Sequence, residues 1–567
     1  MNLPFKEKLE SILKKDERLI SDDGRVLKNK AVELANKLDE SLISSLGADK
    51  DLNKLFFKKI TDLTIFDKDL FIEFVSNKEF LPDSYTAFKN KIGLAVDRNY
   101  LKQDKEVTLV WPYKDCVLEG GQTKEEAKRG EIFWNTTLAP DEINRLLEPK
   151  VLTNWTRYDK DNTKKGRKAT EISDADNLII KGNNLLALHS LKKRYGGRVN
   201  LIYIDPPFNT GNDSFGYNDS FNHSTWLTFM RNRLEVAKEL LSEIGSIYVH
   251  LDQNESHYCK VLMDEIFGKQ NFIREIIWNR GNPSGGKAAA QNWIHAHDTI
   301  LFYAKNKESR VFNKIYEPYS QEYIDERFVH EDEKGRYRLQ RGNRKQYLED
   351  SKGKATTSVW DIPNINVMAK EKQEFDGQKP EVLMQRIIES ATEEGDLILD
   401  YHAGTGTTLA VAHKLNRQYI GIEQMDYIHD LPEARLKAVI AGEQGGISKA
   451  ISWKGGGSFV YTELMPLNDK FVREIEAAKS EKEVVKIWEA IQKNGFVSYR
   501  VDPKKFDEDA KEFADLDLAN QKKFVLESLD VNMLYVNYSD ISDKEYAVGA
   551  DDKKLNNEFY GNASSRV

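Results

Sequence analysis

The run of residues 200–211 reads N-L-I-Y-I-D-P-P-F-N-T-G, and its pattern decides the fold. The first half is apolar without polar alternation, as in a strand of a parallel sheet that is buried on both faces. The two prolines after Asp205 cannot donate to a central ladder, so the strand must end there and open as a loop. Ligands of open α/β sheets bind at the carboxyl ends of the strands. An acid, a stiff backbone and the aromatic Phe208 at this end therefore predict a functional site.

A second strand end of the same kind lies much further along the chain. Residues 397–400 are apolar and end on Asp400, and Y-H-A-G-T-G-T-T follows before an apolar helical pattern. Strand-like and helix-like runs alternate around these two ends, which favours crossover connections and a parallel sheet. The expected strands are 178–180, 201–204, 246–251, 273–278, 299–303, 397–400 and 419–423, with helices at 185–191, 226–241, 258–267, after Lys379 and after 409. We predict an α/β fold with a Rossmann-like, doubly wound, mostly parallel sheet.

Composition is that of an ordinary globular protein. The chain has 567 residues, of which 40% are hydrophobic and 31% charged, enough for three or more domains. Its two cysteines give neither a disulfide framework nor zinc spacing. We find no long apolar run and no signal-peptide pattern, and expect a cytoplasmic protein. The net charge of −8 means that the whole molecule is not attracted to nucleic acid. Screening beyond about 8 Å still allows a local basic surface to bind DNA.

The flanking regions show helical and mixed patterns without evident chemistry. We divide the chain into a helical N-terminal module (1–105), a mixed segment with a basic linker (106–175), the catalytic half of the sheet domain (176–304), an insertion (305–362), the cofactor-binding half (363–445) and a separate α+β C-terminal domain (446–567). In the mixed segment we expect a strand at 107–111, a charged helix at 124–134 and an exposed linker at 159–168. Amphipathic helices at 471–491 and 524–529 suit docking or dimerisation.

The insertion interrupts the α/β rhythm with a basic, polar sequence. Arg, Asn and Gln side chains can read base edges, and basic groups supply salt-dependent phosphate affinity. A solubilising insertion is the alternative interpretation. The candidate DNA-binding residues are Arg336, Arg338, Arg341, Arg344 and Lys345.

The two strand ends support different chemistry. Gly404 and Gly406 let the backbone approach a ligand, and Glu423 at the end of the next strand can accept hydrogen bonds from ribose hydroxyls. A dinucleotide fingerprint would require Gly or Ala at position 409, where the chain has leucine. These residues together predict an adenosine-containing ligand.

An exocyclic amino group of a base is a poor nucleophile because its lone pair is delocalised into the ring. The Asp205 carboxylate can accept one of its hydrogens and a prolyl carbonyl the other, which stabilises the transition state electrostatically. Phe208 offers a stacking face for a base that has left the helix.

These motifs resemble a known family. D-P-P-F-N-T-G followed downstream by D-Y-H-A-G-T-G-T-T resembles amino-group DNA methyltransferases that use S-adenosylmethionine, in the circularly permuted beta order with a target recognition insertion between the motifs. N-L-I-I-K-G-N-N-L-L-A-L (177–188), G-S-I-Y-V-H-L-D-Q-N-E (245–255), Q-K-P (378–380) and W-K-G-G-G-S-F-V-Y (453–461) are similar to modification subunits of type III restriction-modification systems. So are the runs at 81–94 and 113–126.

The resemblance implies a role for each matching residue. The target-base site would comprise Asp205, Pro206, Pro207 and Phe208, and the cofactor site Asp400, His402, Ala403, Gly404, Gly406, Thr407, Glu423, Lys379 and Asn183. Phe208 stands where tyrosine is more usual. His402 replaces an apolar residue, either altering the cofactor pocket or as a tolerated surface change. Lys379 either pairs with the methionine carboxylate or merely begins a helix. His295 and His297 lack acidic or cysteine partners at ligand spacing, so we expect no metal.

The resemblance thus implies an adenine-N6 DNA methyltransferase, because an acid before Pro-Pro is typical of adenine enzymes and serine of cytosine-N4 relatives. It also implies a homodimer with a restriction (helicase-nuclease) subunit as partner. A solitary methyltransferase and a non-catalytic DNA-binding specificity subunit remain alternatives, although the intact D-P-P-F argues against the second. RNA is a further substrate to consider, since an extruded adenine is similar in either polymer.

Overall fold

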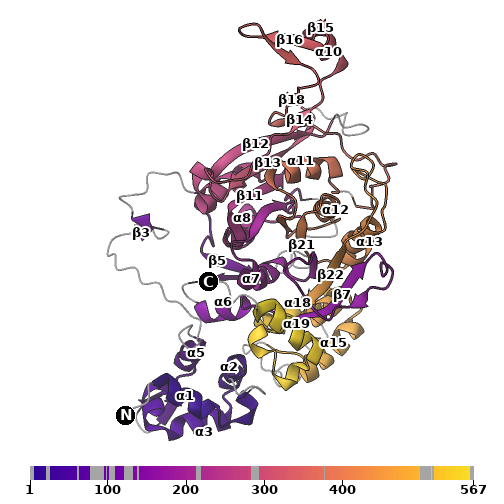
Figure 1. The fold of residues 1–567 in the computed structure, drawn as a ribbon. Coiled ribbons are helices and arrows are strands. Elements are labelled where there is room, and N and C mark those ends of the chain that lie inside the picture. Colours follow the sequence, from indigo (N-terminus) through magenta and orange to yellow (C-terminus); the bar gives the residue numbers. More distant parts are fainter. Residues whose placement is uncertain are drawn as a thin grey trace.

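One eleven-stranded sheet runs through the body of the molecule in the computed structural model (Figure 1). The structure describes residues 5–20, 26–60, 63–76, 95–96, 99–100, 109–119, 132–136, 139–211, 219–281, 293–375, 377–497, 513 and 516–561. From edge to edge the strand order is β19-β12-β13-β11-β10-β20-β21-β9-β22-β7-β8. In chain order the strands are β7 (Leu152–Asp159), β8 (Arg167–Lys168), β9 (Leu178–Lys181), β10 (Val199–Ile204), β11 (Leu241–Leu251), β12 (Phe272–Asn279), β13 (His297–Ala304), β19 (Val359–Asp361), β20 (Leu397–Asp400), β21 (Gln418–Glu423) and β22 (Ser458–Leu464).

Helices cover both faces of this sheet, which explains the apolar run in β10. Ile202 and Ile204 pack into the core under α7 (Asn184–Tyr195), α8 (His223–Leu240) and α9 (Ser256–Met263). The alternate residues Leu201 and Tyr203 pack into the opposite core under α11 (Glu381–Ala391), α12 (Thr407–Lys414) and α13 (Ala434–Ile440). Since successive side chains of a strand point to opposite faces, a strand with two covered faces has no polar positions.

The two strand ends singled out from sequence lie side by side. β10 and β20 are parallel neighbours, with Leu201 opposite Ile398 and Ile202 opposite Leu399. β21 follows as the next parallel neighbour of β20. The direction of winding reverses between β10 and β20, and such a reversal opens a crevice at the carboxyl ends of the strands. The predicted doubly wound sheet is therefore confirmed, with β13 as its antiparallel member among the central strands.

The sheet extends further than the sequence predicts. β22 pairs with β9 in parallel and with β7 antiparallel, and β8 pairs with β7. The prediction that residues after 446 form a separate domain is wrong for residues 458–464, which complete the central sheet. The prediction of an exposed linker at 159–168 is wrong at both ends, because Asp159 ends β7 and Arg167–Lys168 form β8.

The N-terminal module has its own core, built mainly by helices as predicted. It contains α1 (Phe5–Leu13), α2 (Lys28–Asn36), α3 (Glu40–Ala48), α4 (Lys50–Phe56), α5 (Lys68–Ser76) and an unexpected hairpin of β1 (Phe57–Ile60) and β2 (Leu63–Phe66). Next come β3 (Ala95–Val96), β4 (Asn99–Tyr100), β5 (Cys116–Glu119), β6 (Ile132–Asn135) and α6 (Pro140–Leu146). Residues 132–135 form a strand rather than the predicted helix end, and 109–111 are irregular rather than a strand. The similar run at 81–94 and most of the predicted helix at 124–134 lie outside the described residues.

The C-terminal helices pack against the body. They are α14 (Asn468–Ala477), α15 (Glu481–Asn494), α18 (Leu518–Ser528) and α19 (Ala550–Gly561). Asn556 of α19 donates to the Leu152 carbonyl of β7, and Arg194 of α7 donates to the Phe559 carbonyl. No helix in the described part of the chain is long and apolar enough to cross a membrane.

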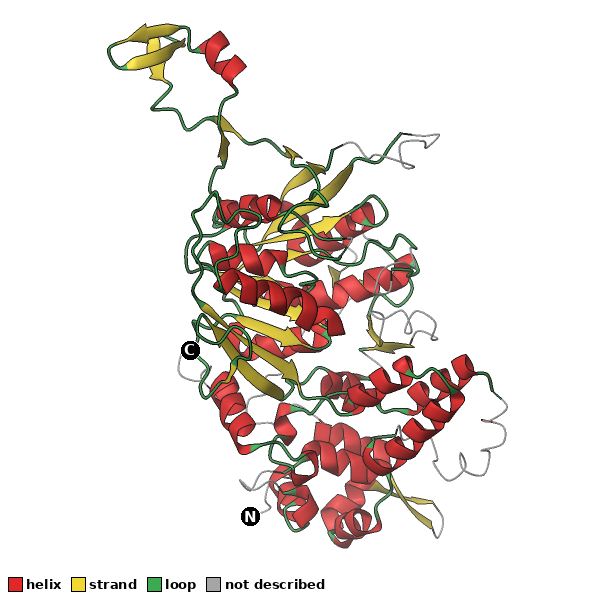
Figure 2. Ribbon diagram, turned by 90° about the vertical axis from the view of Figure 1, so that its right-hand side faces the viewer, coloured by secondary structure: helices red, strands yellow, loops and turns green. Residues whose placement is uncertain are grey.

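The insertion stands away from the body on a narrow stalk (Figure 2). The stalk consists of residues 312–318 and 354–358, where β14 (Tyr316–Glu317) pairs with β18 (Lys354–Ala355). Beyond it lie α10 (Gln321–Arg327), β15 (His330–Asp332), β16 (Gly335–Gln340) and β17 (Arg344–Tyr347), the three strands forming one antiparallel sheet. The chain returns through β19, which pairs with β12.

Candidate active site

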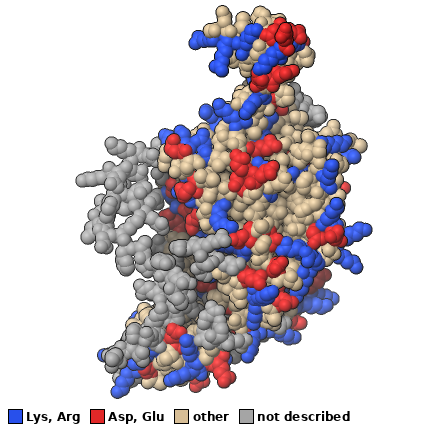
Figure 3. Space-filling model, in the orientation of Figure 1, with Lys and Arg blue, Asp and Glu red and all other residues tan. Residues whose placement is uncertain are grey.

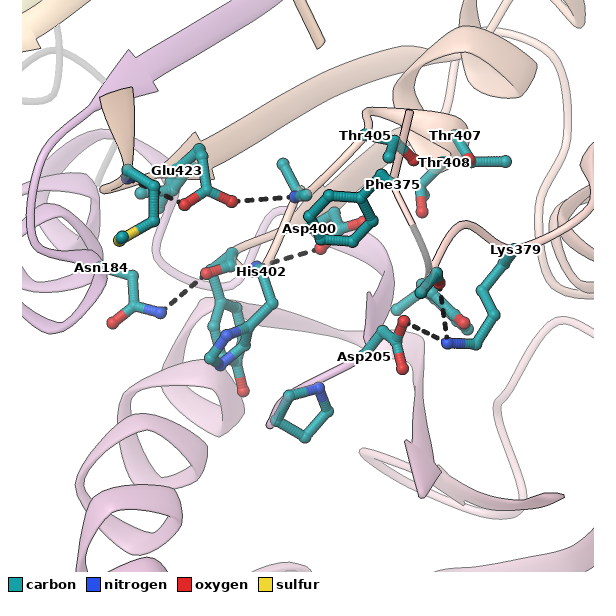
Figure 4. A pocket seen from close by; sticks show the side chains of 18 of the residues that line it. Asn184, Asp205, Phe375, Lys379, Asp400, His402, Thr405, Thr407, Thr408 and Glu423 are labelled. Atoms are coloured by element: carbon teal, nitrogen blue, oxygen red, sulfur yellow. Dashed lines mark hydrogen bonds and ion pairs between the residues drawn. The ribbon is translucent and has the colours of Figure 1, made fainter. Parts of the chain in front are cut away.

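A cavity of about 960 Å³, open mouth included, lies at the carboxyl ends of β10, β20 and β21. It is lined by both predicted motifs, namely Asp205, Pro206, Pro207 and Phe208 on one side and Asp400, His402, Ala403, Gly404, Thr407 and Glu423 on the other, with Lys379 between them (Figure 4). The structure thus brings together eleven of the thirteen residues predicted for the base and cofactor sites; Asn183 and Gly406 are not in its wall.

The two predicted residues outside the cavity wall, Asn183 and Gly406, each precede a helix that begins at the cavity. Asn183 caps α7 through its side chain, which accepts a hydrogen bond from the Leu185 amide at 3.0 Å, and the neighbouring Asn184 lines the cavity instead. Gly406 is the N-cap of α12 and has a φ of +70°; a β-carbon there would lie 2.8 Å from Pro432 Cβ. A larger residue at 406 would therefore be strained and crowded at once.

Asp205 is held by a lysine. Lys379 Nζ donates to Asp205 Oδ2 at 2.5 Å and lies 5.0 Å from the Phe208 ring centre. The other carboxylate oxygen, Oδ1, is buried without a hydrogen-bond partner within the described part of the chain. The carboxylate is therefore oriented through one oxygen while the other remains available to a ligand. Since Lys379 makes this ion pair inside the cavity, it does more than begin a helix.

The D-P-P-F backbone is fixed by a buried tryptophan. Trp226 of α8 is fully buried, and its Nε1 donates to the Pro207 carbonyl at 2.8 Å. That carbonyl is therefore occupied, whereas no hydrogen bond to the Pro206 carbonyl is found among the described residues. Of the two prolyl carbonyls that the sequence offers as acceptors, the structure favours Pro206.

A buried polar chain stands behind Phe208, and sequence reasoning missed it. The His250 ring stacks on Phe208 at 5.9 Å, its Nδ1 lies 2.9 Å from the Tyr203 hydroxyl, and its Nε2 lies 3.1 Å from Asp298 Oδ2. Arg280 Nη1 reaches the other Asp298 oxygen at 3.3 Å. Burial lowers the pKa of His250, so the ring is neutral and can donate to one neighbour while accepting from the other.

Two further carboxylates share the cavity with Asp205. Burial, together with the negative charges of Asp205 and Glu423, raises the pKa of Asp400 to about 7. Burial also raises the pKa of Glu423. Glu423 accepts hydrogen bonds from the amides of Gly404 at 2.9 Å and Met425 at 3.0 Å, so it ties the glycine loop to the end of β21. This concentration of acids favours a ligand with positive charge.

A buried ion network holds Thr407, the cavity residue at the start of α12. Arg435 Nη1 donates to the Thr407 hydroxyl at 2.8 Å, and its Nη2 donates to Glu381 at 2.8 Å. Lys414 also contacts the fully buried Glu381 carboxylate at 2.7 Å. Its members come from three helices and share no sequence motif, so their proximity could not be read from the chain.

Other cavity residues also escaped prediction. Phe375 and Tyr427 approach each other edge-on at 5.6 Å, and Gln424 and Met425 complete that wall. In the sequence, only the position of these residues close to Lys379 and Glu423 along the chain pointed to them. His402 lines the cavity, so the alternative of a tolerated surface change is wrong; burial keeps its pKa well below the ordinary value. His295 Nδ1 lies 3.3 Å from Arg280, a cation that opposes a metal ion there.

The five predicted DNA-binding residues divide into two groups. Arg336 pairs with Asp325 at 3.0 Å, Lys345 pairs with Asp332 at 2.6 Å, and Arg338 donates to the Tyr323 hydroxyl at 2.6 Å inside the small insertion core. Arg341 and Arg344 are exposed at the turn between β16 and β17, and no ion pair of theirs is found among the described residues. Figure 3 shows basic and acidic side chains side by side on this lobe.

The chain matches two protein-family models. Residues 199–434 match the family described as DNA methylase, and residues 39–94 match the type III restriction/modification enzyme methylation subunit. Over 99% of its length the chain is 34% identical to the "Probable type III restriction-modification enzyme HindVI Mod subunit" of Haemophilus influenzae, with 99% of that protein covered. The chain belongs to the family of type III Mod subunits.

Other relatives are more distant. This Mod-family chain is 36% identical to the type III restriction-modification enzyme EcoP15I Mod subunit of Escherichia coli over 25% of this chain and 26% of that one. Among solved structures, the M1.HpyAVI–SAM complex covers 46% of this chain and 98% of that chain at 18% identity, with a TM-score of 0.32. The fold is an open, doubly wound α/β sheet in which the D-P-P-F strand β10 precedes the glycine-loop strand β20 along the chain.

Proposed function

We propose that this Mod-family chain transfers a methyl group from S-adenosylmethionine to the N6 amino group of an adenine in DNA. It acts as the modification and specificity subunit of a type III restriction-modification system. The observation that carries the proposal is the single cavity into which both the Asp205 loop and the Gly404 loop open. A methyl donor and an extruded base have to meet in one such space.

The cavity chemistry suits S-adenosylmethionine. This cofactor carries a sulfonium, an ammonium and one carboxylate, and Asp205, Asp400 and Glu423 supply the matching negative charge. Lys379 is the one Lys or Arg among the described wall residues and would meet the cofactor carboxylate. Glu423 would accept hydrogen bonds from the ribose hydroxyls, and the Phe375–Tyr427 wall would contact the adenine ring. When bound, the cofactor supplies an electrophilic methyl group, which needs no metal for its transfer.

The D-P-P-F loop would hold the target base. Asp205 Oδ1 and the Pro206 carbonyl would each accept one hydrogen of the amino group, while Phe208 would stack on the ring. These two acceptors favour the pyramidal nitrogen of the transition state, where positive charge develops. The nitrogen forms its new bond to the methyl carbon as the carbon–sulfur bond breaks, and the surplus proton leaves to solvent afterwards. His250 would keep the Phe208 ring in the stacking orientation.

The remaining parts serve recognition and assembly. The insertion beyond the stalk would read the DNA sequence, with Arg341 and Arg344 nearest to the DNA backbone. A restriction subunit would be the partner, and two copies of this chain would form the active assembly. The N-terminal module and the C-terminal helices, which lie at the end of the molecule opposite the insertion (Figure 1), are the candidate docking surfaces. We expect the assembly to work in the cytoplasm.

The decisive variant is Asp205→Ala. Removing the acceptor should reduce methyl transfer by at least about 10²-fold, the typical effect of losing one electrostatic stabiliser. Affinities for S-adenosylhomocysteine and for DNA should stay near those of the unaltered chain. Asp430→Ala, which removes an exposed carboxylate outside the cavity, is the matched control. Unchanged transfer of tritiated methyl groups by the Asp205 variant would refute the assigned role.

The same assay, together with a copurification experiment, separates the two alternatives. A non-catalytic specificity subunit would bind DNA without incorporating tritium, even in the unaltered chain. A solitary methyltransferase would incorporate tritium but would not copurify with a helicase-nuclease encoded beside it.

A further inference from the structure

A second cavity lies beneath the stalk of the insertion, apart from the methyl-transfer site. Its floor is the face of β11, β12 and β13, one wall is α11, and the other is formed by stalk residues with β19. Its volume, open mouth included, is about 1060 Å³. The stalk is tied to this region because the Asn313 amide donates to the Ser390 carbonyl of α11 at 2.7 Å.

Four cations from separate elements line the second cavity. They are Arg274 of β12, Arg310 and Lys314 before β14, and Arg386 of α11, and no described lining residue is acidic. In a chain with more acids than bases, this one-sided lining is unusual. Arg386 uses Nη2 for an ion pair with Glu317 at 2.7 Å, just outside the lining. Around the base of the stalk, Lys and Arg side chains gather on the face seen in Figure 3.

Two guanidinium groups present buried nitrogens there. Arg310 Nε and Arg386 Nη1 are inaccessible to solvent and have no hydrogen-bond partner within the described residues. A buried donor without a partner costs about 1–3 kcal/mol, so these groups favour an incoming acceptor. Arginine binds phosphate with short, charge-assisted hydrogen bonds.

The rest of the lining is aromatic. Phe302 stacks on Tyr248 at 4.3 Å, and Phe312 approaches Phe302 at 6.3 Å with near-parallel rings. Phe312 is 49% exposed, so its face is accessible from the mouth. Trp360 lies under Arg386 at 5.4 Å. Aromatic faces of this kind stack on nucleobases with about 1–3 kcal/mol per base.

We propose that the second cavity is a nucleotide site, which holds the phosphate on Arg310 and Arg386 and the base against Phe312. The occupant contacts the stalk and the sheet at once, because Phe312 and Lys314 belong to the stalk while Arg274 belongs to β12. A bound nucleotide therefore fixes the direction in which the stalk carries the insertion. The occupant of the second cavity is either a free mononucleotide or an unpaired nucleotide of the DNA.

The test is calorimetric titration of the full chain, saturated with S-adenosylhomocysteine so that the first cavity is filled. We expect adenosine 5′-monophosphate to bind once per chain, at least tenfold more tightly than adenosine or inorganic phosphate alone. A short oligothymidylate strand is titrated in parallel to separate the two sources. A thermal unfolding transition like that of the unaltered chain shows that each variant is folded, whatever the outcome for the methyl-transfer site.

The variants Arg310→Gln and Phe312→Ala should each weaken nucleotide binding at least tenfold. Arg198→Gln, which removes a partly exposed guanidinium elsewhere, should leave it unchanged. If the monophosphate binds and both variants weaken its binding, a free nucleotide is the ligand. If only the oligothymidylate strand binds and both variants weaken its binding, the ligand is an unpaired nucleotide of the DNA. The proposal is overturned if neither binds, if inorganic phosphate binds as tightly as the monophosphate, or if both variants bind normally.

Discussion

At the scale of single residues, the cavity is governed by three acids and one lysine. Asp205, Asp400 and Glu423 repel one another in a buried space, and only Asp205 is paired with Lys379. A cation entering the cavity would relieve this repulsion. The charged state of Asp400 should therefore control how tightly the cofactor binds, because its pKa of about 7 lies in the range of ordinary assays.

Cofactor binding should consequently depend on pH. Below pH 7 Asp400 is protonated and neutral, and above it the carboxylate attracts the cofactor's positive charge. If binding requires the ionised form, affinity for S-adenosylmethionine should rise about tenfold from pH 6 to pH 8 and then level off. Equilibrium dialysis across this range measures it, and Asp400→Asn should flatten the curve. An affinity that fell with rising pH would contradict the electrostatic argument.

The three acids and Gly404, singled out from the sequence, line one cavity because a strand end fixes their position. Asp205, Asp400 and Glu423 each end a buried strand, and adjacent parallel strands bring such ends together. Asn183 was predicted, but its neighbour Asn184 lines the cavity, because a shift of one residue at the start of a helix turns the side chain by about 100°. Phe375 lies in an irregular segment without periodicity, so only the folded chain places it in the cavity.

At the scale of elements, the hairpin of β16 and β17 shows why charge alone does not define an interface. Arg338 lies over the rings of Phe328 and Tyr323, and holds the small core of the insertion together. Arg336 and Lys345 are neutralised by neighbouring acids. The turn that carries Arg341 and Arg344 is the part of this hairpin with unneutralised charge among the described residues.

We therefore expect Arg341→Ala with Arg344→Ala to weaken DNA binding and to reduce the salt dependence of log K by about 2, one for each lost phosphate contact. Fluorescence anisotropy with a labelled duplex at several salt concentrations measures both quantities. Arg338→Ala is the informative comparison, since it should lower the thermal stability of the insertion instead. If the double variant kept the full salt slope, the hairpin turn would not contact DNA.

Element prediction was accurate where both faces are buried and weak at the edges. The strands around Asp205 and Asp400 were placed within a few residues, because short apolar runs that end at proline or glycine are typical of a sheet covered on both faces. β8 was missed because it consists of two basic residues that pair only with β7. β7 was missed as a sheet member because its partner β22 is encoded some 300 residues later. Pairing over such a separation leaves no local pattern.

At the scale of the whole molecule, the catalytic sheet depends on strands from both flanking regions. β22 contributes Phe459, Val460, Tyr461 and Leu464 to the cores on either side. Each buried side chain is worth about 1.5–3 kcal/mol, and the sum is comparable to the roughly 5–15 kcal/mol that stabilises a domain. The region after residue 446 is therefore part of the fold and not an appendage to it.

A chain that ends at residue 445 should accordingly fail to fold. Without β22 the edge of β9 is uncovered, so we expect no cooperative thermal transition and no binding of S-adenosylhomocysteine. A chain that ends at residue 561, with β22 and the four described C-terminal helices kept, should behave like the full protein. Cofactor binding by the 445-residue chain at full affinity would show that the sheet tolerates the loss.

The adjacency of β10 and β20 also has a consequence for biosynthesis. During translation β10 can pair with β11 early, but its other edge waits until the recognition insertion and then residues 397–400 have left the ribosome. Until that moment the nascent chain has an unprotected strand edge and no place for the methyl donor. A message broken inside the insertion would thus yield only inert, aggregation-prone fragments, never a methylase lacking sequence discrimination.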